Sequence, residues 1–227
     1  MFKNAKVVTL AFALVVTTSL ISTPAHSAER ATSVPGCAKS TSKGHVPAKV
    51  KQPLVAAKAP AKTLTLTTNC GDIVISLLGA KAPITVTSIA ALANAGYYNK
   101  SLCHRLTTEG IFVLQCGDPT ASGSGSPTGW TGYVDENLPK ATGVNYPAGT
   151  VAMANSGPKT NGSQFFVVYK DTVLGPNYTI WGKITKGLDL VQKVGDVGAY
   201  QMNGQQAVYA GDGYPIQTVE ILKASAK

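Results

Sequence analysis

The alternation of apolar and polar residues predicts many short β-strands between residues 63 and 227. Residues 63–68 and 72–78 alternate with period two around the sequence NCGD, which is typical of an antiparallel hairpin. Two more strands are predicted within residues 102–118, joined by a turn at Glu109 and Gly110. The same pattern predicts strands over residues 149–155, 163–169, 178–184 and 216–222.

Two segments have helical spacing instead. Residues 82–96 carry Pro83 near the start and Gly96 at the end, which are common helix start and stop signals. Residues 187–194 predict a second, shorter helix. Many short strands with only two helices indicate a mainly β fold, either a barrel or a sandwich.

The first 28 residues have the pattern of a secretory signal peptide. Two lysines precede an apolar run over residues 7–22, and small residues follow it. The run is shorter than the roughly 20 residues that a membrane span needs. We expect cleavage between Ala25 and Glu29, and therefore an exported protein that is secreted or associated with the cell envelope. An uncleaved anchor and lipid attachment at Cys37 are the alternatives.

Residues 29–62 are rich in Lys, Ala, Pro and Ser, which predicts a flexible basic linker before a domain at 63–227. The net charge of +9 is uneven: residues 1–62 hold nine basic residues and one acid (+8), and residues 63–227 hold eleven and ten (+1). The nearly neutral domain argues against nucleic acid as a partner. The linker is expected either to contact an anionic cell wall or membrane surface or to act only as a spacer.

Four cysteines in an exported chain predict two disulfides. Three pairings are possible, and sequence alone does not choose among them. Cys103 and Cys116 flank the second predicted hairpin, which favours this pair and leaves Cys37 to join Cys70. Free buried thiols are the alternative.

Most catalytic constellations are absent from the sequence. His104 is the only histidine of residues 63–227, so a histidine-based metal site is not expected. No G-x-S-x-G motif accompanies it, which argues against a catalytic triad. The glycine-rich residues 123–129 lack the lysine of a phosphate-binding loop and are interpreted as an ordinary loop.

A group of residues without an obvious nucleophile remains. Arg105 lies on one predicted strand and Gln115 on the next. Gln164 and Phe166 are two apart on a later strand and so share a face, whereas Phe165 points to the other face and can fill the core.

Three stretches carry this group and closely resemble the cyclophilins: CHRLTTEGIFVLQCGDPTASGSG (103–125), GTVAMANSGPKTNGSQFF (149–166) and IWGKITKGLDLVQKV (180–194). The resemblance covers residues 63 to about 223. It implies a closed eight-stranded antiparallel β-barrel capped by two α-helices. It also implies peptidyl-prolyl cis-trans isomerase activity without a cofactor or metal, acting on proline-containing peptides and unfolded exported proteins. We expect a monomer.

The resemblance also implies roles for individual residues. Arg105 would be the catalytic residue, and Tyr178 would stand at the rim of the proline pocket. The pocket would be lined by Phe112, Val113, Phe166 and Leu174, and the peptide backbone would be held by Gln115, Ala154, Asn155 and Gln164.

The chain departs from the family pattern at several positions. Two extra residues separate Arg105 from Phe112, and Cys116 replaces the first of two usual glycines. Val173 stands where many members have tryptophan, and Tyr178 where histidine is usual. These last two changes make tight binding of cyclosporin-type inhibitors doubtful. They also support the alternative function, a non-catalytic module that binds proline-containing peptides.

Overall fold

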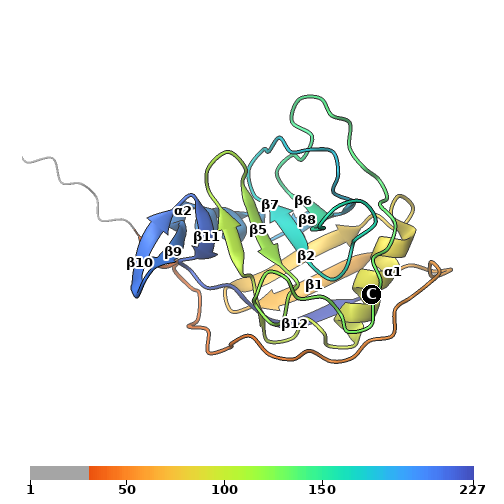
Figure 1. Cartoon of the computed structure of the whole chain (residues 1–227), viewed down its shortest axis with the longest axis horizontal. Helices are drawn as coiled ribbons and strands as arrows, with labels where there is room; N and C mark the ends of the chain where they lie inside the picture. Colours follow the sequence, from red (N-terminus) through yellow and green to blue (C-terminus); the bar gives the residue numbers. More distant parts are fainter. Residues whose placement is uncertain (1–30) are drawn as a thin grey trace, which may run out of the picture.

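The structure, a computed structural model, describes residues 31–227 (Figure 1), so the predicted signal peptide lies outside the described residues. Two helices are present, α1 (Pro83–Asn94) and α2 (Leu188–Val197). The strands are β1 (Thr63–Thr68), β2 (Gly71–Leu77), β3 (Ser101–Leu102), β4 (Arg105–Thr107), β5 (Val113–Cys116), β6 (Thr150–Met153), β7 (Phe165–Val168), β8 (Ile180–Lys186), β9 (Ala199–Asn203), β10 (Gln206–Ala210), β11 (Asp212–Pro215) and β12 (Glu220–Ala226). The prediction of a mainly β fold with two helices is confirmed.

The prediction of a closed barrel of eight strands is wrong. The described residues form one twelve-stranded sheet in the order β10-β9-β11-β4-β5-β7-β6-β8-β2-β1-β12-β3, in which β10 and β3 are the two ends. The count is higher partly because Cys103 and His104 interrupt the extended chain between β3 and β4. Residues 199–215 add three more strands, β9 to β11, which the hydrophobic pattern did not predict.

The core forms where the period-two pattern predicts it. Leu64 and Leu66 of β1 lie opposite Ile75 and Ile73 of β2, and all four side chains are buried. Helix α1 packs against β12. At its start, the backbone N–H groups of the first turn donate to the carboxylate of Glu136, which satisfies donors that have no partner within the helix.

Residues 31–62, here called the strap, run along the outside of the domain (Figure 1). Cys37 is bonded to Cys70 by a disulfide, and Val34 is buried. The backbone N–H of Ala57 donates to the Thr87 hydroxyl at 2.9 Å. The part of the expected linker that the structure describes is therefore attached to the domain by a disulfide, a buried side chain and hydrogen bonds. Its composition offers few apolar side chains, but a disulfide and backbone hydrogen bonds can hold a segment without them.

Both favoured disulfide pairings are confirmed. The second disulfide joins Cys103, which follows β3, to Cys116 at the end of β5. Two disulfides are typical of a protein that folds in an oxidising, exported compartment. Within residues 31–227, no helix has the length and apolar character that crossing a membrane requires.

Candidate functional site

A cavity of about 180 Å³ opens beside strands β4, β5 and β7, and we call it the apolar pocket. Its apolar wall belongs to a small cluster around Val113 and Phe166 that is separate from the main core. The lining residues are Arg105, Ile111, Val113, Gln115, Ala154, Asn155, Phe166, Leu174 and Tyr178. Eight of the ten residues that the resemblance assigned to the substrate site are thus brought together.

Strand alternation decides which residues before and along β5 reach the apolar pocket. Ile111, Val113 and Gln115 line it, whereas Phe112 points to the opposite side and packs on the Tyr169 ring at a centroid distance of 6.0 Å. The structure therefore does not bring Phe112 to this pocket, where the resemblance had placed it. Successive side chains of extended chain face opposite ways, so Phe112 and Val113 cannot both point into one pocket.

Aromatic packing fixes the apolar wall. Phe166 is only 4% exposed, and its ring meets the Tyr178 ring edge to face at 5.5 Å. Tyr146, which is fully buried, contacts both rings and donates from its hydroxyl to the Tyr178 carbonyl at 3.1 Å. Phe165 points into the main core, as predicted. The pocket wall is thus continuous with a buried aromatic cluster.

Arg105 on β4 is held by two neighbours. Its Nε donates to Oδ1 of Asp212 at 2.8 Å, and its Nη2 donates to Oδ2 of the same carboxylate at 2.6 Å. Its Nη1 donates to Oε1 of Gln115 at 3.3 Å. The hydrogen bonds that Arg105 donates to Asp212 raise the pKa of Arg105 above its already high value, so the side chain stays charged. No sequence pattern had indicated Asp212.

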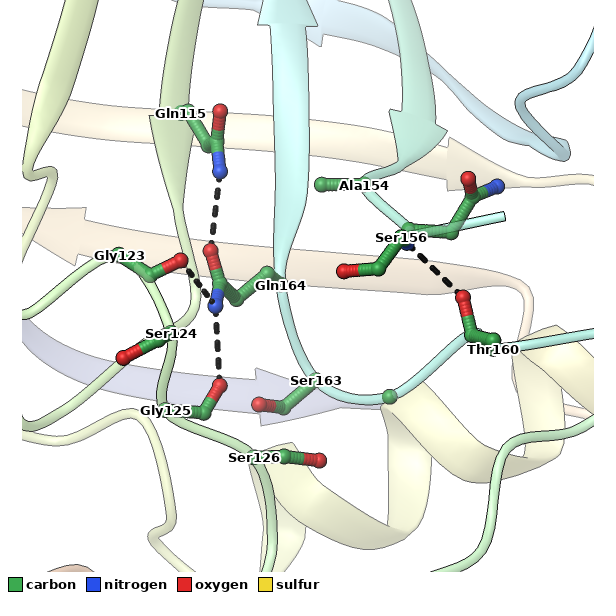
Figure 2. A pocket seen from close by; sticks show the side chains of 12 residues that line it. Gln115, Gly123, Ser124, Gly125, Ser126, Ala154, Ser156, Thr160, Ser163 and Gln164 are labelled. Atoms are coloured by element: carbon green, nitrogen blue, oxygen red, sulfur yellow. Dashed lines mark hydrogen bonds between the residues drawn. The ribbon is translucent and has the colours of Figure 1, made fainter.

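A second cavity of about 230 Å³ adjoins the first, and we call it the polar pocket (Figure 2). The two cavities share Gln115, Ala154 and Asn155. The other residues that line the polar pocket are Gly123, Ser124, Gly125, Ser126, Ser156, Thr160, Gly162, Ser163 and Gln164. The predicted site residue Gln164 therefore lines the polar pocket and not the apolar one.

A chain of side-chain amides connects the two pockets. The Nε2 of Gln115 donates to Oε1 of Gln164 at 2.9 Å (Figure 2). The Nε2 of Gln164 in turn donates to the carbonyl oxygens of Gly123 and Gly125, at 3.1 and 2.9 Å. These contacts orient Gln115, whose Oε1 accepts from Arg105.

Asp118 organises the loop that forms one side of the polar pocket. Its carboxylate accepts from the backbone N–H groups of Thr120, Gly123 and Gly125 at 2.8–3.0 Å. Burial alone would raise the pKa of Asp118, but hydrogen bonds from Thr120, Gly125 and Ser122 lower it below its ordinary value. A Cβ at Gly125 would collide with the carboxylate, so the loop requires glycine there.

The strap holds this loop and its continuation from the outside. The backbone N–H of His45 donates to the Pro119 carbonyl at 2.9 Å. The Gln52 side chain makes two hydrogen bonds with the backbone of Thr131, donating to its carbonyl at 2.8 Å and accepting from its N–H at 2.9 Å. A segment predicted as a linker thus supports one wall of the site.

The apolar pocket can hold a compact hydrocarbon ring while amide and guanidinium groups contact polar atoms attached to it. Arginine supplies fixed N–H donors. None of the residues that line this pocket is a serine, cysteine, histidine or carboxylate. The site is therefore suited to binding and polarising an amide.

The comparison with protein families gives a match over residues 63–226. The matching model is described as cyclophilin type peptidyl-prolyl cis-trans isomerase/CLD. This range contains every residue that lines the two pockets.

Relatives with the same activity in their names occur in bacteria and animals. The "probable peptidyl-prolyl cis-trans isomerase B" of Mycobacterium leprae is 45% identical over 65% of this chain and 54% of its own length. The protein of that name from Mycobacterium tuberculosis is 43% identical over 60% of this chain and 47% of its own. This chain thus spans about half the length of these relatives. The human "peptidyl-prolyl cis-trans isomerase-like 1" is 39% identical over 70% of this chain and 89% of its own length.

Solved structures show the same fold. A cyclophilin type peptidyl-prolyl cis-trans isomerase of Cryptosporidium parvum superposes with a TM-score of 0.60 and 26% identity, covering 74% of this chain and 98% of that one. A second structure of that protein, determined in the presence of the dipeptide Ala-Pro, gives a TM-score of 0.59 over 73% of this chain and 98% of that one, again with 26% identity.

Proposed function

This chain belongs to the family of cyclophilin-type peptidyl-prolyl cis-trans isomerases, and from that premise we propose that it catalyses rotation about X–Pro peptide bonds. The observation that carries the proposal is the position of the Arg105 guanidinium among the residues that line the apolar pocket. The pocket suits a proline ring, and the guanidinium suits the amide attached to it.

The chemistry of the reaction fits these residues. Amide resonance imposes a rotation barrier of about 18–20 kcal/mol. A hydrogen bond from Arg105 to the prolyl nitrogen favours the pyramidal nitrogen, which has lost its conjugation, and so weakens the double-bond character of the C–N bond. Each 1.4 kcal/mol or so of preferential binding to the twisted amide gives about a tenfold rate increase. No bond is broken, so the reaction needs no nucleophile.

The lining residues divide the work of binding. The proline ring packs against the apolar side chains of Ile111, Val113, Phe166 and Leu174. Tyr178 lies at the rim of the pocket. The peptide backbone binds where the two pockets meet, at Gln115, Ala154 and Asn155. Gln164 lines the polar pocket and orients Gln115 through the hydrogen bond between their side chains. Phe112 has no direct role in this proposal.

We assign proline-containing segments of unfolded exported proteins as the substrates. The Cryptosporidium parvum relative has been determined in the presence of Ala-Pro, which is the smallest substrate fragment of this kind. The two disulfides support an exported location, and the signal-peptide pattern of residues 1–28 agrees with it. We also propose that the protein acts as a monomer.

A non-catalytic module that binds proline-containing peptides is the second candidate. Val173 is 62% exposed and offers little apolar surface where many family members have tryptophan. The same position is the reason to expect weak binding of cyclosporin-type inhibitors. The paired guanidinium of Arg105 favours catalysis over mere binding.

An isomerisation assay on the full chain separates the two functions. A peptide with one X–Pro bond is followed with wild type, Arg105→Ala and Lys186→Ala. Lys186 is the matched control because it is also a cation paired with an aspartate, Asp72, but lies outside both pockets. We expect Arg105→Ala to lose about 100-fold or more in kcat/KM and Lys186→Ala to stay within about twofold of wild type.

Binding of the same peptide is measured in parallel. If wild type binds the peptide without accelerating isomerisation, the chain is a binding module. Full activity of Arg105→Ala would contradict the assigned mechanism. Because the Arg105 side chain is 40% exposed, the variant should fold normally, and the stability of both variants should match that of wild type.

A further inference from the structure

The segment formed by strands β9, β10 and β11 places Asp212 beside Arg105. These strands form the edge of the sheet next to β4 (Figure 1), and Asp212 pairs with Thr107 across the two strands. Since Arg105 begins β4 and lies two residues before Thr107, its side chain is on the same face as this pairing and reaches Asp212.

The backbone of Asp212 is anchored on both sides. Its carbonyl accepts from Nε2 of Gln201 at 2.7 Å, and the carbonyl of the preceding Gly211 accepts from the N–H of Thr108 at 2.7 Å. A Cβ at the following Gly213 would collide with the Tyr200 carbonyl, so the close approach of β9 and β11 depends on glycine. The carboxylate is thus presented from a fixed point.

The contact between Asp212 and Arg105 is bidentate. One carboxylate oxygen accepts from Nε and the other from Nη2, so the pair fixes the plane of the guanidinium as well as its position. With the hydrogen bond to Gln115, three of the five N–H donors of Arg105 are occupied. One donor on Nη1 and one on Nη2 remain for a substrate.

This ion pair contributes little to folding. The side chains of Arg105 and Asp212 are 40% and 48% exposed, and exposed pairs of this kind are weakly stabilising because water and salt screen them. Restricting the guanidinium to one orientation has a larger effect on a reaction than on stability, since catalysis depends on geometry within a fraction of an ångström.

We propose that Asp212 is a positioning residue, which holds the Arg105 guanidinium in the plane needed to donate to the prolyl amide. The inference rests on the proposed isomerase function and adds to it a residue of the β9–β11 segment. It places no new group in contact with the substrate.

The test compares the full-length wild type with Asp212→Asn, Asp212→Glu and Asp72→Asn. Asp72→Asn is the matched control, because it removes one partly exposed, paired carboxylate that lines neither pocket. We expect Asp212→Asn to lower kcat about tenfold with KM changed less than about twofold, since binding is kept and orientation is lost. Asp212→Glu, which keeps the charge, should regain part of the lost kcat, and Asp72→Asn should match wild type.

A nitrogen-15 NMR spectrum of the Arg105 Nε–H group provides a readout that does not depend on activity. We expect one sharp, slowly exchanging resonance in wild type and in Asp72→Asn, and a broadened or fast-exchanging one in Asp212→Asn. An active wild type with unchanged kcat in Asp212→Asn would overturn the positioning role. An inactive wild type would overturn the proposed function, and a sharp resonance in Asp212→Asn would then also show that Asp212 does not hold the guanidinium.

Discussion

The apolar and polar pockets lie side by side and share three lining residues, yet they are built by different means. The apolar pocket rests on strands β4, β5 and β7 and on the aromatic cluster around Phe166. The polar pocket rests on a loop gathered around Asp118, and the strap holds that loop from outside. The apolar pocket is thus formed by the sheet itself, whereas the polar pocket depends on a loop that the strap contacts.

This difference indicates how each pocket should respond to damage. Loss of an aromatic side chain from the sheet changes packing that runs into the buried interior. Loss of the strap removes hydrogen bonds, one disulfide and the packing of Val34 in the main core. The apolar cluster around Phe166 contains no residue of the strap. The apolar pocket should therefore tolerate damage to the strap, whereas the polar pocket should not.

The largest effect is expected for Phe166→Ala. The Phe166 ring is 4% exposed, so its removal leaves a buried cavity and takes away apolar surface that lines the apolar pocket. We expect kcat/KM to fall about 100-fold and the free energy of unfolding to fall by about 3 kcal/mol. An isomerase assay and denaturant unfolding measure the two effects. Phe166→Leu is the control and should lose less in both; equal activity of Phe166→Ala and wild type would show that the ring does not bind the substrate.

A smaller effect on activity is expected from opening the disulfide of the strap with Cys37→Ser and Cys70→Ser together. The bond spans 33 residues, so its loss should lower the free energy of unfolding by about 3 kcal/mol. Turnover of a peptide that fills only the apolar pocket should stay within about twofold, while a longer peptide that enters the polar pocket should bind about threefold more weakly. Unfolding, turnover and calorimetric binding check these expectations.

The matched control for that experiment is the double variant Cys103→Ser and Cys116→Ser. This disulfide is attached to β5, next to Gln115, so its loss should reduce turnover of the short peptide as well. The proposed contrast between the pockets fails if the strap variant loses turnover of the short peptide as strongly as this control.

The smallest effect is a pH dependence at His104, which adjoins both pockets. It precedes Arg105, and its ring lies beside Gly123. Burial lowers the pKa of His104 below its ordinary value of 6.5, against the opposing effect of Asp118. The folded state therefore binds fewer protons than the unfolded state just below pH 6.5, so stability is full above that pH, falls as the pH decreases from about 6.5 towards the folded pKa, and levels off below it.

Unfolding at about pH 7.5 and about pH 5.5 measures this dependence. His104→Asn should flatten it, and His45→Asn, in the strap, should leave it unchanged. A pH dependence that persists in His104→Asn would assign it to other groups.

Much of the sheet could be predicted because strand alternation is a local signal. The hairpin of β1 and β2 and the opposite orientations of Phe165 and Phe166 follow from period two. The same rule is consistent with the position of Phe112: the resemblance assigned two consecutive residues to one pocket, and in the structure Val113 lines it while Phe112 packs on Tyr169.

Other parts could not be predicted because their stabilisation is not local. Residues 199–215 mix polar residues and glycine, and they form strands because β4 offers them an unpaired edge. The strap is held by Cys37 and by contacts with residues far along the chain, which no composition reveals. The number of strands and the openness of the sheet depend on these additions.

The sequence by itself determined the mainly β class, the family, both disulfide pairings by preference, and most residues of the apolar pocket, because alternation and short motifs act over a few neighbouring positions. Only the tertiary structure decided that Ile111 replaces Phe112 in the apolar pocket, that the strap supports the polar pocket, and that Asp212 holds Arg105. These two charged residues are 107 positions apart. Their contact depends on the register between β11 and β4, and a register between distant strands is set by the packing of the whole sheet.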